Sequence, residues 1–543
     1  NSKSQRSIQR YRSLEIPAQI DQNGVLIRGT ACDFSPLALR VRILPESLLS
    51  FTWFNPEAPC ALSLWKDAQI VFSGACECLR TSTDTTRTEL VLSPSDVEIS
   101  RRKRTQIRNP RRNLTPSPII SFSHPLCTKR VDRKAYDISS TGLSLLEDGP
   151  ERVLMPGMIV PQLTIKYAGG LELKCRAQVI YSREFGGTIR SGLAILDMDL
   201  TAFSQLTQIL NSFTDQYSFV CNRTDTNALW RLFFDTDFIY PKKYTLMQPY
   251  RRGLKETYRR LYEENPSIAR HFTYEKDGEV FGHLSMVRAY EKTWLIHHHA
   301  ARPLENRLPG FQVLKQAMLF LHGISRFPSC CTDYVMCYYR PENRFPARTF
   351  GGFATSIKDA QCCSLDLFAY TQYYVLNWSL KQSTRPELWE LAFYYKRQSG
   401  GLLMDVLGLS DSQHPNDALA NLFSRLGFVR KSRVFSLAFK DSLAAVLIVN
   451  QSDPALNLSE LLNSITVIVI NEDILRWEVL SSAIAWLSFM YKIRVIPLLL
   501  YPPQYVHREG VAFETSYQLW ILNTAYSTQF MEYMQRKYRM KYE

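Results

Sequence analysis

The chain has 543 residues, too many for one hydrophobic core, and this length indicates several domains of about 100–200 residues each. A composition of 45% hydrophobic and 21% charged residues is typical of folded globular protein and excludes collagen-like, coiled-coil and largely disordered chains. The formal net charge of +14 favours an anionic partner such as a nucleotide, a nucleic acid or an acidic membrane surface.

Membrane and targeting segments are not expected. No apolar run reaches the roughly 20 residues that a membrane helix needs, and the polar, basic residues 1–20 lack the apolar stretch of a signal peptide. The twelve cysteines are scattered, and no C-x-x-C occurs among them. We therefore expect a cytoplasmic protein with free thiols and no metal site.

The first notable pattern lies near the N-terminus. Arg6 and Arg10 form an R-x-x-x-R, and residues 16–20 after it read as a strand. Asp33 and Ser35 then open a D-x-S-x-x-A pattern that ends at Ala38. Either pattern alone is common, so their order and spacing are what matter.

A concentrated basic run follows at residues 101–112. It holds seven cations: Arg101, Arg102, Lys103, Arg104, Arg108, Arg111 and Arg112. Asn109 and Pro110 interrupt the run, so we expect an irregular loop that leads into a strand at residues 119–122. A solvated linker and a nucleic-acid-binding loop both fit this run by itself.

The N-terminal pattern recurs after this run. Arg108 and Arg112 form another R-x-x-x-R, as do Arg104 and Arg108, and a D-x-S-x-x-G runs from Asp137 to Gly142. Pairing Arg10 with Arg112 gives an offset of 102 residues, and the aspartates are offset by 104. A shift of one small domain indicates an internal duplication.

This ordered pair of patterns resembles the PilZ family of small β-barrels, which bind the bacterial messenger cyclic di-GMP. The resemblance implies one barrel over residues 1–100, with Ala38 in place of the motif glycine, and a second over residues 101–215 with the complete motif. Further segments read as strands at residues 143–146, 163–167, 171–180 and 191–198, and residues 202–213 read as a closing helix.

The residue types suit that ligand. Guanidinium groups bind phosphate and match the acceptor edge of guanine, and a carboxylate accepts from the guanine N–H groups. The resemblance implies binding by Arg104, Arg108, Arg111, Arg112, Asp137, Ser139 and Gly142, and a possible second site at Arg6, Arg10, Asp33 and Ser35. Capping of a turn within the barrel is the alternative role for the aspartate and the serine.

The C-terminal half alternates strands and helices. Residues 271–275 and 280–287 read as a hairpin, 294–300 as a strand, 309–324 as a helix and 334–339 as a further strand. This order resembles the core of GNAT acyltransferases, and the domain is expected over residues 216–380. The nearest match to the family's acyl-CoA loop contains Arg307 and Gly310, but Gln312 replaces a small residue and Phe350 replaces the general-acid tyrosine.

A second, degenerate copy is expected over residues 381–543. Strands at 434–439, 444–449, 465–470 and 494–500 and a helix at 475–491 repeat the order, but residues 471–476 have no glycine and two carboxylates where a phosphate loop would lie. Enzymatic activity is left open, and the altered loops argue against it. His297, His298 and His299 alternate faces in a strand, so they are not expected to share a metal.

The sequence therefore predicts a multidomain chain of two PilZ-like β-barrels followed by mixed α/β tandem GNAT-like domains. The leading hypothesis is a bacterial, cytoplasmic cyclic di-GMP effector whose GNAT-like region acts through a protein partner. A cyclic di-GMP-regulated, acyl-CoA-dependent acyltransferase is one alternative, and a nucleic-acid-binding protein is another.

Overall fold

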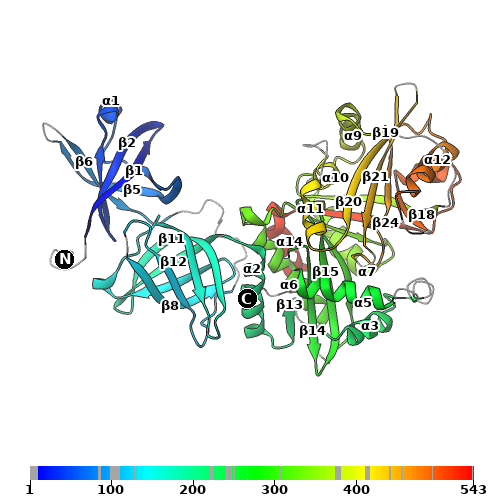
Figure 1. The fold of residues 1–543 in the computed structure, drawn as a ribbon, viewed down its shortest axis with the longest axis horizontal. Coiled ribbons are helices and arrows are strands. Elements are labelled where there is room, and N and C mark those ends of the chain that lie inside the picture. The colour runs from blue at the N-terminus through cyan, green and yellow to red at the C-terminus, as the bar shows by residue number, and fades with distance from the viewer. Residues whose placement is uncertain are drawn as a thin grey trace. The chain divides into compact units, whose positions relative to one another are not determined.

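The computed structural model describes residues 10–83, 87–97, 110–127, 129–220, 224–239, 244, 248, 251–265, 267–305, 307–373, 381–409, 416–439, 442–453, 456–491, 493, 495–540 and 542. The chain divides into two units (Figure 1). The first comprises Asn1–Leu210, Arg326–Cys330 and Tyr542–Glu543, and the second comprises Asn211–Ser325 and Cys331–Lys541.

Alternating burial marks strands of the first barrel. In β3 the buried residues are Leu39, Val41 and Ile43, which gives a strand with one face toward the core. The strands form a closed barrel in the order β1-β2-β3-β6-β5-β4. Their bounds are β1 Tyr11–Gln22, β2 Val25–Ser35, β3 Ala38–Ile43, β4 Cys60–Lys66, β5 Gln69–Thr83 and β6 Thr88–Pro94.

The second barrel repeats the first. Its closed order, β10-β11-β12-β9-β8-β7, gives the same neighbours once β7 is matched to β1 and the remaining strands follow in sequence. Their bounds are β7 Ile119–Ser123, β8 Arg130–Ser139, β9 Gly142–Glu147, β10 Ile159–Lys166, β11 Glu172–Phe185 and β12 Thr188–Met198. The expected pair of β-barrels is confirmed, and the expected helix after them is α2 (Leu200–Thr214).

The second unit contains one open sheet of twelve strands, in the order β13-β14-β15-β16-β17-β24-β18-β23-β22-β21-β20-β19. The first six in chain order are β13 Ser218–Val220, β14 Ala269–Lys276, β15 Glu279–Tyr290, β16 Thr293–Ala301, β17 Tyr334–Tyr339 and β18 Cys363–Tyr373. The others are β19 Lys381–Gln382, β20 Arg430–Phe439, β21 Ser442–Ser452, β22 Ile465–Val469, β23 Ile496–Tyr501 and β24 Thr515–Asn523.

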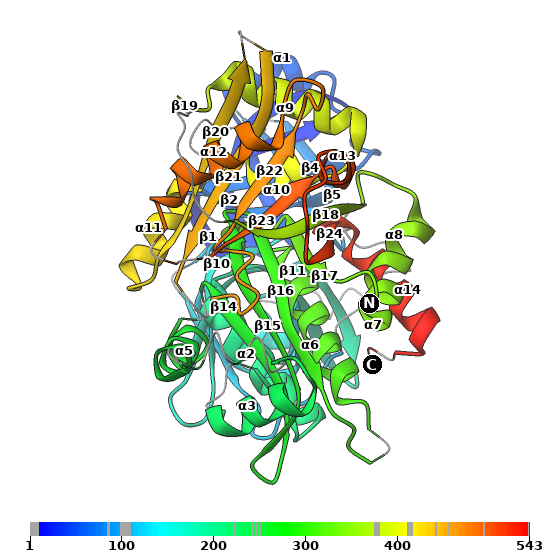
Figure 2. The same ribbon diagram turned by 90° about the vertical axis from the view of Figure 1, so that its right-hand side faces the viewer.

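The two ends of this sheet are built alike. On one side β16 pairs in parallel with β17, and on the other β22 pairs in parallel with β23. The final strand of each half is exchanged: β18 pairs with β23, and β24 pairs with β17. Figure 2 shows β14–β16 and β20–β22 toward opposite ends, with the exchanged strands between them. The halves expected as separate domains over residues 216–380 and 381–543 thus contribute to one sheet, and the GNAT resemblance stays a prediction.

Helices cover this sheet and begin at local signals. Asp225 caps α3, Pro309 is the first residue of α6, and Thr384 with Glu387 forms a capping box at α9. The α-helices of this unit are α3 Thr226–Asp235, α5 Arg251–Arg259, α6 Pro309–Ile324, α7 Arg344–Pro346, α8 Gly352–Ile357, α9 Arg385–Gln398, α10 Leu403–Leu407, α11 Asp417–Arg425, α12 Trp477–Ser488, α13 Pro503–Arg508 and α14 Ser527–Tyr538, whereas α1 Leu48–Phe51 belongs to the first unit.

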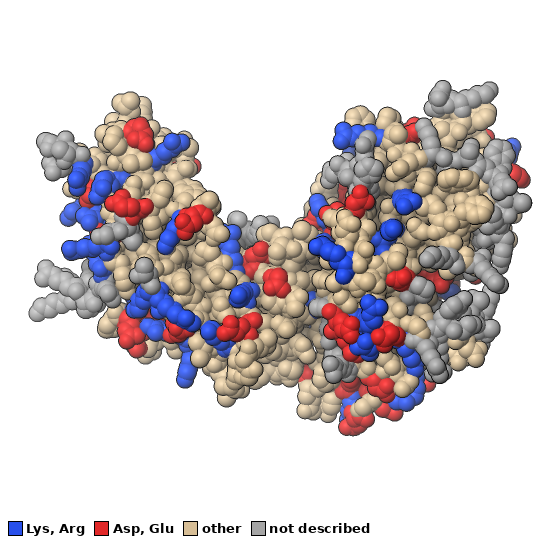
Figure 3. Space-filling view, viewed as in Figure 1, with Lys and Arg blue, Asp and Glu red and all other residues tan. Residues whose placement is uncertain are grey.

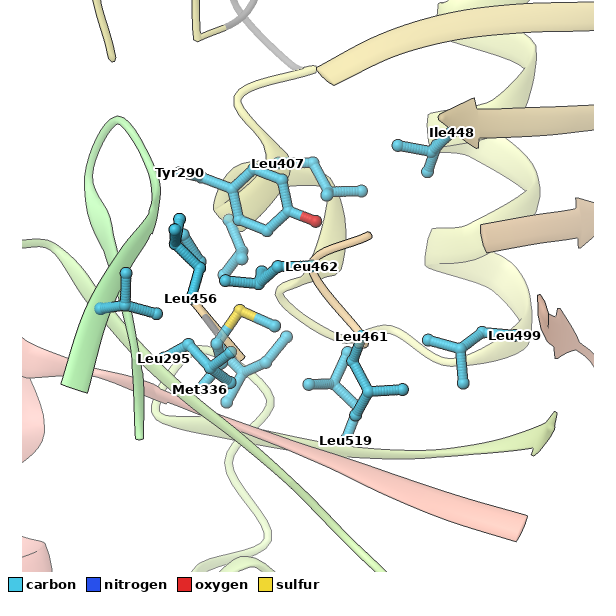
Figure 4. Close-up of a cluster of buried hydrophobic side chains, with 14 of the residues drawn as sticks. Tyr290, Leu295, Met336, Leu407, Ile448, Leu456, Leu461, Leu462, Leu499 and Leu519 are labelled. Carbon is cyan, nitrogen blue, oxygen red and sulfur yellow. The ribbon is translucent and has the colours of Figure 1, made fainter. Parts of the chain in front are cut away.

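The core of the second unit joins both halves of the sheet. Leu295 and Met336 come from the first half, and Ile448 and Leu499 come from the second, within one buried cluster (Figure 4). Leu519 of the exchanged strand β24 belongs to the same cluster. Burial of apolar surface therefore holds the two halves together in addition to the strand pairing.

The histidine run departs from the expected alternation. The register of β15 and β16 shifts near His297, and His298 has a φ of 52°. This bulge brings the rings of His297 and His298 to a centroid distance of 3.9 Å, so these two neighbours do not point to opposite faces. The prediction of strict alternation was wrong because a bulge inserts one residue into the pleat.

Two further expectations concern membranes and thiols. Within the described part of the chain, no helix is long and apolar enough to cross a membrane. The described cysteines are free thiols, and most of them are buried.

Candidate functional site

The candidate site of the second barrel centres on the buried carboxylate of Asp137. A register shift between Ala135 and Asp137 places a bulge just before this residue on β8. Asp137 is 5% exposed, and its Oδ1 accepts from Arg111 Nη1 at 2.6 Å and from Ser144 Oγ at 2.8 Å. Its Oδ2 accepts from Arg190 Nη2. Both carboxylate oxygens thus bind guanidinium groups that come from different parts of the chain.

Arg190 is a site residue that the sequence patterns do not mark. It lies on β12, and its Nε also donates to Ser144 Oγ at 3.2 Å. Its guanidinium lies 4.7 Å from the ring centroid of Tyr136 and 5.4 Å from that of Phe185. These contacts hold the cation in one position. No motif spacing could reveal Arg190, because its place depends on the pairing of β12 with β9.

The predicted arginines occupy different positions. Arg112 pairs through its backbone with Ile138, with N–O distances of 2.8 and 2.9 Å. Its side-chain Nε is buried and has no hydrogen-bond partner among the described residues. Arg111 contacts Asp137 directly, and its side chain is 35% exposed. Arg104 and Arg108 lie outside the described residues.

Ser139 and Gly142 close the turn between β8 and β9. Ser139 Oγ donates to the Gly142 carbonyl at 3.1 Å, which is the turn-capping role named as the alternative. A Cβ on Gly142 would lie 2.5 Å from the carbonyl oxygen of Leu193 on β12. A side chain here would therefore force β9 and β12 to shift, whatever the residue contributes to a ligand.

The first barrel has a related but different arrangement. Asp33 is 1% exposed, and its Oδ1 accepts from Arg10 Nε at 2.7 Å, while its Oδ2 binds Arg40. Arg40 also donates to Glu89 at 3.2 Å, and Arg42 lies 3.8 Å from the same carboxylate. Burial lowers the pKa of Arg40, but Asp33 and Glu89 outweigh it and leave that pKa raised. Ser35 ends β2, half-buried, and Arg6 lies outside the described residues.

The second unit contains a cavity of about 2000 Å³ beside the predicted acyl-CoA loop. Gly310, Tyr339, Asn457 and Tyr491 are among the residues that line it. Arg307 also borders it, but its Nη1 donates to Tyr274 at 2.7 Å. Arg307 and Gly310 thus lie at the same cavity, on the stretch between β16 and α6.

Buried histidines and tyrosines form a network beside this cavity. Tyr258 bonds His283 at 3.0 Å, and Tyr262 bonds His297 at 3.3 Å. Burial lowers the pKa of His297 to about 3 and that of His283 well below its usual range. Among the described residues, no group of three or more potential ligands is placed to bind a metal ion.

Comparison with known proteins gives likenesses among solved structures alone: no family model and no curated protein matches the chain. YcgR from Escherichia coli, in complex with c-di-GMP, is 18% identical over 37% of this chain and 84% of its own, with a TM-score of 0.18. MrkH of K. pneumonia with c-di-GMP is 14% identical over 37% and 87%, with a TM-score of 0.19. MotI/DgrA of Bacillus subtilis is 10% identical over 38% and 99%, with a TM-score of 0.18. Likenesses this remote carry no argument about function, which rests on the site geometry.

Proposed function

We propose that the chain is a cyclic di-GMP receptor and that its second barrel binds the ligand. The observation that carries this proposal is a buried carboxylate, Asp137, held between Arg111 and Arg190. Nearby, Arg112 pairs through its backbone with Ile138, and its buried Nε has no hydrogen-bond partner among the described residues. Two guanidinium groups on one carboxylate leave an excess of positive charge, which favours an anionic ligand.

The ligand chemistry fits this arrangement through an exchange of partners. The guanine N1–H and N2–H of cyclic di-GMP need an acceptor, and both oxygens of Asp137 already accept from arginine. Arg111 is the more exposed of the two arginines, at 35% against 24% for Arg190. Guanine therefore displaces Arg111 from Asp137, and the released guanidinium binds a phosphate.

The second unit is proposed as the output region, acting on a protein partner. The ligand must then favour one state of the chain over another. Because the ligand is a bacterial messenger, the proposal places the chain in a bacterial cytoplasm.

Isothermal titration of the full chain with cyclic di-GMP tests the proposal. Asp137→Asn and Arg111→Ala are expected to weaken binding by about tenfold or more, because each removes a charge-assisted hydrogen bond. Arg130→Ala is the matched control, since it removes an arginine from β8 whose side chain is 66% exposed. An absence of binding by the wild-type chain would refute the proposed function.

Acyl-CoA binding is the second candidate, favoured by the cavity beside Gly310. Two features of the loop oppose acyl-CoA binding. Pro309 has no backbone N–H to donate. The backbone N–H groups of Phe311 and Gln312 donate to the Leu308 carbonyl and are therefore not free to bind a pyrophosphate. Acetyl-CoA at about 1 mM is expected to leave the melting temperature unchanged if the region is a scaffold, and to raise it if the cavity binds the nucleotide.

Nucleic-acid binding has less support. Lys and Arg side chains are interleaved with Asp and Glu on the face seen in Figure 3. A single-sign basic surface, typical of proteins that bind nucleic acid, is not seen there among the described residues. Competition between an oligonucleotide and cyclic di-GMP, repeated at several salt concentrations, distinguishes the two ligands.

A further inference from the structure

We infer that the two barrels have different roles: Arg190 is a recognition residue of the second barrel, and Glu89 closes the matching site of the first barrel to anions. This inference rests on the proposed function and specifies which of the two sites is used. It concerns residues outside both sequence signatures, and it follows from comparing strand registers.

The registers align the barrels residue by residue. Asp33 pairs with Arg40 across β2 and β3, as Asp137 pairs with Ser144 across β8 and β9. Two residues after Arg40 on β3, and two residues after Ser144 on β9, the paired residue on the final strand of each barrel can be compared. There Arg42 pairs with Glu89 of β6, and Leu146 pairs with Arg190 of β12. Glu89 and Arg190 therefore hold the same place in the two barrels with opposite charge.

In the first barrel, the reversed charge adds a second carboxylate to the arginine cluster. Glu89 binds Arg40 and lies near Arg42, while Arg40 also binds Asp33. The Nε atoms of Arg40 and Arg42 are buried without hydrogen-bond partners among the described residues, as is that of Arg112. Both barrels thus have arginine side chains at the site, and the difference is the additional carboxylate of Glu89 in the first barrel. A phosphate that enters the first barrel is repelled by the charge of Glu89 and must displace this carboxylate from Arg40.

In the second barrel, the cation at this place is fixed before any ligand arrives. Arg190 contacts Asp137 and Ser144, and the ring of Tyr136 lies 4.7 Å from its guanidinium. Tyr136 is the bulged residue before Asp137, and Cys32 occupies the corresponding bulge before Asp33. The first barrel therefore lacks both the cation on its final strand and the ring that supports it. Preorganisation of this kind reduces the entropy lost on binding.

A matched pair of substitutions tests the inference by titration of the full chain with cyclic di-GMP. Arg190→Gln and Arg40→Gln each remove the cation on Oδ2 of the central aspartate, one in each barrel. We expect Arg190→Gln to weaken binding by about tenfold to a hundredfold, as for loss of a charge-assisted contact. We expect Arg40→Gln to leave the Kd within about twofold and the number of sites unchanged.

Arg190→Lys is the second variant, because it keeps a charge beside Asp137 and removes the planar fork. It is expected to bind more weakly than wild type even if Arg190→Gln fails to fold, and circular dichroism checks the fold of each variant. The inference is overturned if Arg190→Lys binds as wild type does. It is also overturned if Arg40→Gln lowers the affinity or the number of sites as much as Arg190→Gln. A wild-type chain that binds no cyclic di-GMP would instead refute the proposed function.

Discussion

Gly142 and Ala38 occupy the same position in the two motifs, yet the barrels tolerate them for different reasons. Gly142 pairs with Ala194 of β12, so its Cα faces the neighbouring backbone closely. In the first barrel, the paired residues of β3 and β6 begin at Leu39 and Leu92, one position beyond Ala38. The methyl group of Ala38 is therefore outside the tight part of its barrel.

Gly142→Ala is expected to destabilise the second barrel by about 1–3 kcal/mol, because its Cβ would lie 2.5 Å from the Leu193 carbonyl and strands must shift. Chemical denaturation of the full chain, followed by circular dichroism, measures the change in the midpoint. Gly149→Ala is the control, since nothing lies within 4 Å of a Cβ at that position. Equal midpoints for Gly142→Ala and wild type would contradict the steric argument.

His124 is a buried residue of the second barrel that has no part in the proposed site. Its Nε2 lies 3.1 Å from the Val153 carbonyl, and its Nδ1 accepts from the Leu126 N–H at 3.2 Å. This pairing fits the neutral ring, with the proton on Nε2. Burial lowers the pKa of His124 to about 4.

Protonation of His124 is expected to destabilise its barrel as the pH falls. The unfolded chain takes up the proton near pH 6.5, whereas the folded chain resists it until about pH 4, so stability is lost between these values. The loss amounts to about 2–3 kcal/mol at pH 4.5. Burial raises the pKa of the nearby Glu147, which acts in the opposite direction.

Denaturation at pH 7 and pH 4.5 of wild type and His124→Asn isolates this contribution, because Glu147 is common to both proteins. The wild-type chain is expected to lose more stability on acidification than the variant does. The same loss in both would show that His124 does not titrate as described.

At the scale of elements, hydrophobic alternation and turn residues predict most of the strands. Helix α6 and strand β17 have the predicted bounds, and β7, β9, β10, β11 and β12 overlap predicted segments, whereas β8 was not predicted. Alternation identifies a strand because it reports which face is buried. It contains no information about which other strand will lie alongside.

In the candidate site, too, residues close in sequence could be predicted, whereas a residue brought in by strand pairing could not. Asp137, Ser139 and Gly142 lie in one turn, so their spacing along the chain reveals their proximity. Arg190 reaches Asp137 across 53 residues, through a strand pairing that no local pattern encodes. The bulge at His298 is a similar case, since its position depends on contacts such as Leu458 N–H to His298 Nε2, at 2.8 Å. Long-range register is therefore the part that the sequence alone does not yield.

At the scale of the whole molecule, the two halves of the second unit share one sheet, because one strand of each half pairs with strands of the other. The hydrogen bonds of β18 go to β23 and β24, and those of β24 go to β17 and β18. Separation of the halves would leave β18 and β24 without paired neighbours, open one edge each of β17 and β23, and expose the shared core.

Cleavage of the full chain at a protease site introduced after residue 380 is expected to leave the two pieces associated on size-exclusion chromatography. Separated in urea and diluted singly, the C-terminal piece should lack a cooperative unfolding transition and regain it only when the two pieces are mixed, whereas the N-terminal piece still contains the two closed barrels. The uncleaved chain taken through the same urea cycle is the control. A cooperative transition in the C-terminal piece alone would show that this half is an independent domain.

The exchange also sets an order of events during synthesis. Strand β17 is translated long before β24, the partner that covers its edge, because β24 lies at Thr515–Asn523 near the end of the chain. At about 5–20 residues per second, the ribosome needs roughly ten seconds or more to produce that partner. During this interval a strand rich in tyrosine, with buried Val335 and Met336, has an open edge. Until its last strand emerges, the nascent chain therefore exposes an unpaired strand edge, which is a site of aggregation.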